Sequence, residues 1–198
     1  MFDGKFRRPV DRAVQPVGKA LRRTGLTPDH LTVAGLVVGV AAAVAIGTGR
    51  LFLGLVLVIL AALPDLLDGA LAKASGAASE RGAFFDSTVD RITDAVLMGG
   101  IAWHFAATES QFLVLLPFAV SSVAQIISYQ RAKAESLGLD AKGGLMERAE
   151  RIVLICLGLA FPVLLIPVLW VLLVLSSVTA VQRFARVWRQ AEVAPITQ

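Results

Sequence analysis

Long apolar runs are the feature that most constrains the fold of this 198-residue chain. Each run has about the length that a helix needs to cross the hydrocarbon core of a bilayer, roughly 20 residues. Lipid offers no partner to unpaired backbone groups, and no run shows the strict alternation of a membrane β-strand. The sequence therefore predicts an all-α integral membrane protein with six transmembrane helices. They are expected at 31–48, 51–72, 84–107, 111–129, 152–167 and 168–184.

The composition agrees with a membrane protein. The chain is 56% hydrophobic and 17% charged, whereas a soluble domain carries about 25% charged residues. This excludes an ordinary soluble enzyme, a disordered chain and a nucleic-acid-binding domain, although the formal net charge is +4. No repeat or linker interrupts the sequence, so residues 1–198 are expected to form a single domain. A tight turn near Pro167 is expected between the last two runs.

The segment 1–24 differs from the rest of the chain. Val10, Val17 and Leu21 recur at helical spacing, and basic residues cover the other faces. This pattern is typical of an amphipathic helix that lies in the membrane interface. The segment is therefore expected to precede a six-helix transmembrane bundle at 31–186. A disordered basic tail is the alternative.

The basic residues predict the orientation in the membrane. Seventeen of the 19 lysines and arginines fall in segments expected on one side, whereas Arg50 lies on the other side and Arg91 within a run. Cytoplasmic segments of membrane proteins carry such an excess. We therefore expect a multi-pass protein of the cell membrane with both termini and the active site in the cytoplasm.

Aspartates within the apolar runs indicate a site, because intramembrane charges are costly and usually functional. Asp65 and Asp68 lie near the end of the second run, and Asp86 and Asp90 lie at the start of the third. Spacings of three and four place each pair on one helical face. Four neighbouring carboxylates require protons or cations between them, and oxygen ligands without His or Cys suit Mg²⁺, Mn²⁺ or Ca²⁺. A two-metal site that clamps a diphosphate is expected; helix caps and surface aspartates are the alternative.

These aspartates belong to a longer motif. Its positions here are Asp65, Asp68, Gly69, Ala72, Lys73, Gly82, Asp86 and Asp90. Their spacing resembles the signature D-x2-D-G-x2-A-R-x8-G-x3-D-x3-D of the CDP-alcohol phosphotransferases. Lys73 stands where that family usually has arginine, so the charge is kept but the planar fork is lost.

The resemblance implies a reaction and its residues. A substituted phosphate would pass from a CDP-linked donor to an alcohol with release of CMP, in a homodimeric enzyme. Two divalent cations, Mg²⁺ or Mn²⁺, would be held by Asp65, Asp68, Asp86 and Asp90, and Asp90 would also be the base toward the acceptor hydroxyl. The residues implied to bind the CDP donor are Asp29, Asp65, Asp68, Gly69, Ala72, Lys73 and Gly82.

A second basic set follows the motif and bears on the acceptor. It would suit an anionic alcohol, because arginine binds phosphate with two parallel hydrogen bonds; anchoring to lipid headgroups is the alternative. The segments GLTPDHLT, QIISYQRAKAESLGL and GGLMERAERIVL resemble the actinobacterial phosphatidylinositol phosphate synthases. This resemblance implies CDP-diacylglycerol as donor and inositol 1-phosphate as acceptor. The residues implied to hold the acceptor phosphate are Ser128, Arg131, Lys133, Arg151 and Arg183.

Two other functions stay open. Glycerol 3-phosphate is also phosphorylated, so a basic pocket alone does not separate it from inositol 1-phosphate. A divalent-cation transporter would also carry aspartates in the membrane, although its path needs polar groups along its whole depth and these runs are nearly all apolar in their outer halves. Metal-dependent CMP release favours the enzyme, and metal flux without it favours the transporter.

Overall fold

The computed structural model describes residues 27–75, 79–109, 111–141 and 143–193. Across these residues the regular structure is helical, which confirms the predicted all-α fold class. The expected helix at 1–24 lies outside the described residues. The helices are α3 (Pro28–Gly47), α4 (Leu51–Ser75), α5 (Glu80–Thr108), α6 (Leu115–Ser136), α7 (Arg148–Ala160) and α8 (Leu165–Val193), with 3-10 turns η1 (Gln111–Val114) and η2 (Pro162–Leu164).

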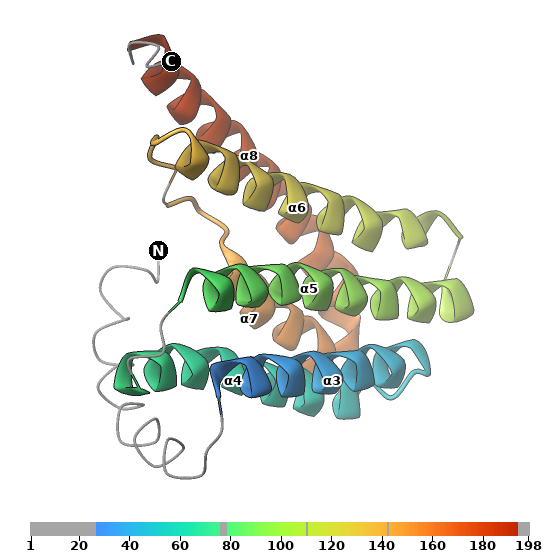
Figure 1. The fold of residues 1–198 in the computed structure, drawn as a ribbon. Coiled ribbons are helices and arrows are strands. Elements are labelled where there is room, and N and C mark those ends of the chain that lie inside the picture. Colours follow the sequence, from blue (N-terminus) through green and yellow to red (C-terminus); the bar gives the residue numbers. More distant parts are fainter. Residues whose placement is uncertain (1–26, 76–78, 110, 142, 194–198) are drawn as a thin grey trace.

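The described helices pack in a ring, α3–α4–α7–α8–α6–α5 and back to α3. α3 packs against both α4 and α5, whereas α6 packs against α5 and α8, and α7 packs against α4 and α8. Figure 1 shows the start of α3, the end of α4, the start of α5 and the end of α6 at the same end of the bundle. The aspartate motif and the basic residues of α6 therefore lie at a common end.

Local caps explain where the helices begin at this end. Thr27 and His30 form a reciprocal capping box at the start of α3, and Pro28 occupies the first turn, where a missing N–H costs nothing. The side chain of Ser79 accepts a hydrogen bond from the backbone N–H of Gly82 and caps α5. Each cap satisfies backbone donors that a helix start leaves without partners.

The break between the last two helices differs from the prediction. The sequence predicted a turn near Pro167, but α7 ends at Ala160 and Pro167 lies in the first turn of α8. Phe161 is extended (φ −126°, ψ 90°), because a residue that precedes a proline is disfavoured in the helical region. Pro162 therefore ends the helix, whereas a proline in a first turn is tolerated.

Three helices are long and apolar enough to cross a membrane. They span Pro28–Gly47, Phe112–Ser136 and Pro162–Glu192, and a shorter apolar helix spans Leu51–Pro64. The third and fifth predicted runs are also helical, but α5 carries several charged side chains in its first half and α7 has 13 residues. Large apolar side chains such as Phe52, Phe112 and Val163 are exposed on the helix surfaces, as lipid-facing residues are.

Small residues bring α3 and α5 into close contact. A Cβ atom built on Gly100 would lie 2.5 Å from the carbonyl oxygen of Ala43 and 2.7 Å from its Cα. Both of those atoms are backbone, so they yield only if the helix moves. Close helix contacts in membrane proteins rely on such small residues.

Replacing Gly100 with alanine should therefore destabilise the fold, by about 1–3 kcal/mol as in other overpacked contacts. The neighbouring Gly99 is the matched control, because no atom lies within 4 Å of a Cβ built there. Gly99→Ala should leave stability unchanged or slightly raised, since alanine favours a helix over glycine. Thermal unfolding of both variants in detergent checks this, and equal midpoints would contradict the packing argument.

Candidate active site

The aspartate motif falls on two consecutive helices. Asp86 and Asp90 lie one turn apart on α5, and both are partly buried. α4 ends at Ser75 and α5 begins at Glu80, so the two halves of the motif lie at adjoining helix ends. The motif residues of α4 are Asp65, Asp68, Gly69, Ala72 and Lys73, and the description of that stretch covers its backbone only.

The two motif aspartates of α5 have side chains that suit a hard divalent cation. Asp86 and Asp90 offer only carboxylate oxygens, which Mg²⁺ and Mn²⁺ accept as ligands. Among the side chains that the structure describes, no group of three or more His, Cys, Asp or Glu could by itself hold a metal ion. The aspartates of α4 are needed to complete the predicted set of four, because α5 supplies only two of its members.

Two of the predicted donor-binding residues lie close together. Asp29 is in the first turn of α3, and its Oδ2 lies 3.4 Å from Nη2 of Arg81 at the start of α5. A Cβ atom on Gly82 would lie 3.9 Å from Oδ1 of Asp29 and 3.3 Å from Oγ of Ser79. The starts of α3 and α5 thus meet at Gly82, which leaves little room for a larger side chain.

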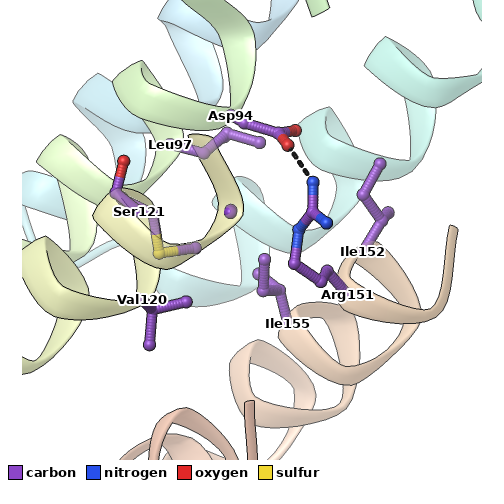
Figure 2. Close-up of a pocket in the computed structure, with 9 residues that line it drawn as sticks. Asp94, Leu97, Val120, Ser121, Arg151, Ile152 and Ile155 are labelled. Carbon is purple, nitrogen blue, oxygen red and sulfur yellow. Dashed lines mark hydrogen bonds and ion pairs between the residues drawn. The ribbon is translucent and has the colours of Figure 1, made fainter. Parts of the chain in front are cut away.

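Two arginines in the first turn of α7 bind carboxylates of α5. Arg148 Nη1 lies 2.8 Å from Oδ1 of Asp90, and Arg148 Nε donates to Oδ1 of Asp94 at 3.3 Å. Arg151 Nη2 donates to the second oxygen of Asp94 at 2.5 Å, an ion pair drawn in Figure 2. We call the row Asp90–Arg148–Asp94–Arg151 the ion-pair chain.

The ion-pair chain is largely withdrawn from solvent. The side chains of Arg151 and Asp94 are 6% and 13% exposed, and Asp90 is 15% exposed. A buried charge is tolerated when it is paired, and removing one partner leaves the other uncompensated. The ion-pair chain therefore links the motif aspartate Asp90 to Arg151, a residue predicted to bind the acceptor phosphate, through contacts between opposite charges.

Arg183 of α8 is also buried and has mostly backbone partners. Its Nη1 donates to the carbonyl of Ile127 at 2.9 Å, and its Nη2 donates to the carbonyl of Gly143 at 3.0 Å. Glu147 lies 3.5 Å from the same Nη2. The Nε atom of Arg183 is buried and has no hydrogen-bond partner among the described residues. Arg183 thus joins the middle of α6 to the loop before α7 and to α8, and its Nε stays available to a further hydrogen-bond acceptor.

The predicted acceptor residues of α6 do not all share a face. Ser128 follows Ile127, which binds Arg183, and its hydroxyl donates to the carbonyl of Ala124 at 3.0 Å. Arg131 lies one turn further along and donates to Glu135 at 3.0 Å. Lys133 is exposed and only two residues from Arg131, a spacing that points side chains to different faces. By their spacing on α6, Ser128 and Arg131 share a face, and Lys133 lies on another.

A small cavity lies beside the Asp94–Arg151 pair (Figure 2). Apart from that pair and Ser121, its lining is apolar and includes Val120 and Ile155. Its volume of about 10 Å³ is close to the least that holds one water molecule. It is far too small for a sugar phosphate, since ligand pockets usually measure about 300–1,000 Å³.

Arg148 lay in the basic set that follows the motif, but neither it nor Asp94 was assigned a role in the site. Both had a signal in the sequence. Asp94 lies one helical turn after Asp90 and extends the carboxylate face of α5, and Arg148 lies one turn before Arg151. The sequence alone does not show that the carboxylate face of α5 meets the arginine face of α7, because the whole of α6 lies between these helices in the chain.

Comparison with known proteins identifies a family and several relatives. The family model described as CDP-alcohol phosphatidyltransferase matches residues 25–185. A phosphatidylinositol phosphate synthase of Mycobacteroides abscessus is 40% identical over 182 residues, which cover 87% of this chain and 82% of that protein. The Corynebacterium glutamicum protein of the same name is 38% identical over 186 residues, which cover 89% and 84%.

Solved structures are similar over nearly the whole chain. The Mycobacterium tuberculosis phosphatidylinositol phosphate synthase with CDP-DAG bound matches with a TM-score of 0.85 and 34% identity, over 94% of this chain and 100% of that one. The structure of the same enzyme in complex with manganese and citrate also matches with a TM-score of 0.85, over 93% of each chain. The resemblance thus extends to the helical architecture as a whole.

Proposed function

Because the chain belongs to the CDP-alcohol phosphatidyltransferase family, we propose that it transfers the phosphatidyl group of CDP-diacylglycerol to inositol 1-phosphate, producing phosphatidylinositol phosphate and CMP. The relatives named phosphatidylinositol phosphate synthase support this reaction at 34–40% identity. The observation that carries the choice of a phosphorylated acceptor is the burial of two arginines, Arg151 beside Asp94 of α5 and Arg183 beside Ile127 of α6. Buried arginines are suited to bidentate binding of phosphate.

The metal ligands proposed are Asp65, Asp68, Asp86 and Asp90. The manganese complex of the M. tuberculosis enzyme supports a divalent cation in this chain as well, and the oxygen-only donor set of α5 fits Mg²⁺ or Mn²⁺. Two such ions would neutralise the diphosphate of the donor and stabilise the leaving CMP.

The residues of the chain then have distinct tasks. Asp90 takes the proton of the acceptor hydroxyl, as a carboxylate within reach can do. The donor is bound by the residues implied by the motif, with Gly82 and Asp29 at the meeting point of α3 and α5. The acceptor phosphate is bound by Ser128, Arg131, Lys133, Arg151 and Arg183. The free Nε of Arg183 supports this assignment, because it is a buried donor that a phosphate oxygen would satisfy.

The proposed setting is a six-span bundle in the cell membrane. All six predicted runs correspond to described helices, and three of them meet the length and composition of a membrane span. The shared end of α4, α5 and α6 would face the cytoplasm with both termini, since the basic residues gather there. We carry over the homodimer from the family and the interfacial helix at 1–24 from its amphipathic pattern.

The test is CMP release by the full-length protein in detergent with CDP-diacylglycerol and Mg²⁺. Inositol 1-phosphate, glycerol 3-phosphate and free inositol are compared as acceptors. Turnover with inositol 1-phosphate alone is the expected result. Turnover with glycerol 3-phosphate alone would keep the family and overturn the acceptor, and metal flux in liposomes without CMP release would favour a transporter instead.

A further inference from the structure

Arg148 places a positive charge directly on a predicted metal ligand. Its Nη1 lies 2.8 Å from Oδ1 of Asp90, and the side chains are 20% and 15% exposed. Arg91 lies 3.6 Å from the other carboxylate oxygen, Oδ2, at a longer and more exposed contact. If Asp90 is a metal ligand, the guanidinium and a divalent cation would both be attracted to its negative charge.

Asp94 is a second partner of Arg148, and Arg148 contacts it in the same position in which it contacts Asp90. Arg148 Nε already donates to Oδ1 of Asp94 at 3.3 Å. The guanidinium thus bridges two carboxylates one turn apart on α5, and its Nη1 can leave Asp90 while its charge stays neutralised by Asp94. Arg151 holds the other oxygen of Asp94 and fixes that carboxylate in place.

We propose that Arg148 is an internal counter-ion that competes with the divalent cation for Asp90, and that Asp94 is the positioning residue that holds Arg148 when the cation binds. This inference rests on the proposed function, since it takes Asp90 as a metal ligand. In addition to that function, Arg148 would stabilise the carboxylates when no metal is bound. When the metal binds, Asp94 would keep the displaced Arg148 paired.

A purely structural role for the ion-pair chain leads to a different expectation. If Arg148 only fastens α7 to α5, its loss loosens the aspartates and weakens metal binding. If it competes for Asp90, its loss strengthens metal binding. The sign of the change in metal affinity therefore separates the two roles, and it is measured without any substrate.

The experiment is Mn²⁺ binding to the full-length protein in detergent, followed by electron paramagnetic resonance of the free ion. Arg148→Gln should bind Mn²⁺ about tenfold more tightly than the unchanged protein, because a neighbouring positive charge is removed. Arg148→Lys keeps the charge and should return the affinity most of the way. Asp94→Asn should weaken Mn²⁺ binding, since Arg148 then loses the second carboxylate that draws it away from Asp90. Arg189→Gln, on the exposed end of α8, is the control and should leave the affinity unchanged.

The double variant tests whether Asp94 acts through Arg148. In the Arg148→Gln background, Asp94→Asn should no longer weaken Mn²⁺ binding, whereas an effect through space alone would be additive. Weaker binding by Arg148→Gln would overturn the competition, and full additivity would overturn the positioning role of Asp94. If the unchanged protein bound no Mn²⁺, the proposed metal site would itself fail. Tight binding without the predicted changes would overturn this inference alone.

Discussion

Replacing Asp90 with asparagine should reduce CMP release by at least about 10³-fold. General-base catalysis contributes roughly 10²–10⁴-fold by itself, and the neutral amide is also a poorer ligand for a divalent cation. Asparagine has nearly the same shape as aspartate, and Arg148 keeps Asp94 as a charged partner, so the fold around position 90 should be largely kept. Donor binding should largely survive, because the other motif residues remain in place.

The measurement is single-turnover CMP release, with donor binding measured separately by equilibrium dialysis of labelled CDP-diacylglycerol in mixed micelles. Glu109→Gln is the matched control, because it makes the same carboxylate-to-amide change at the opposite end of α5. It should keep full activity. Turnover of Asp90→Asn equal to that of the unchanged enzyme would contradict both the base and the metal-ligand assignments.

Replacing Arg151 with methionine should raise the KM for inositol 1-phosphate by about 10- to 100-fold, the loss expected for a hydrogen bond to a charged group. The KM for CDP-diacylglycerol should change by less than about twofold, because the hydrogen-bond partner that Arg151 has among the described side chains is Asp94, which is not a predicted donor-binding residue. Methionine fills much of the same space, so the small cavity beside Asp94 should not grow greatly. Steady-state kinetics with each substrate varied in turn makes this measurement.

The effect of Arg151→Met on the stability of the fold must be separated from its effect on acceptor binding. Arg151→Met leaves Asp94 with Arg148 as its arginine partner among the described residues, so the midpoint of thermal unfolding should fall. Adding Asp94→Asn should recover part of that midpoint, because the buried carboxylate is no longer charged, but it should not recover the acceptor KM. An unchanged acceptor KM in Arg151→Met would show that this arginine serves only as a partner of Asp94.

The helices and the aspartate motif could be predicted because both depend on near neighbours in the sequence. Apolar runs longer than about 18 residues have few stable alternatives to a helix in a membrane. Asp86 and Asp90 share a face of α5 through their spacing alone. The break before α8 was placed wrongly because two prolines compete for it, and only the backbone decides which one stands in a first turn. The roles assigned to the individual site residues stay predictions.

The partners of the buried arginines were decided by the tertiary structure alone. Arg148 and Arg151 meet Asp94 across 54 and 57 residues of sequence, and Arg183 binds the backbone of Ile127 across 56. From the sequence, these arginines were an undivided basic set that either an acceptor phosphate or lipid headgroups could explain. Sequence by itself determined which residue types enter the membrane and at what spacing, because helix geometry is local. Which charges neutralise one another depends on how α5, α6, α7 and α8 are arranged. A buried charge is strongly destabilising without a partner of opposite charge, and the packing of distant helices decides which residue is that partner.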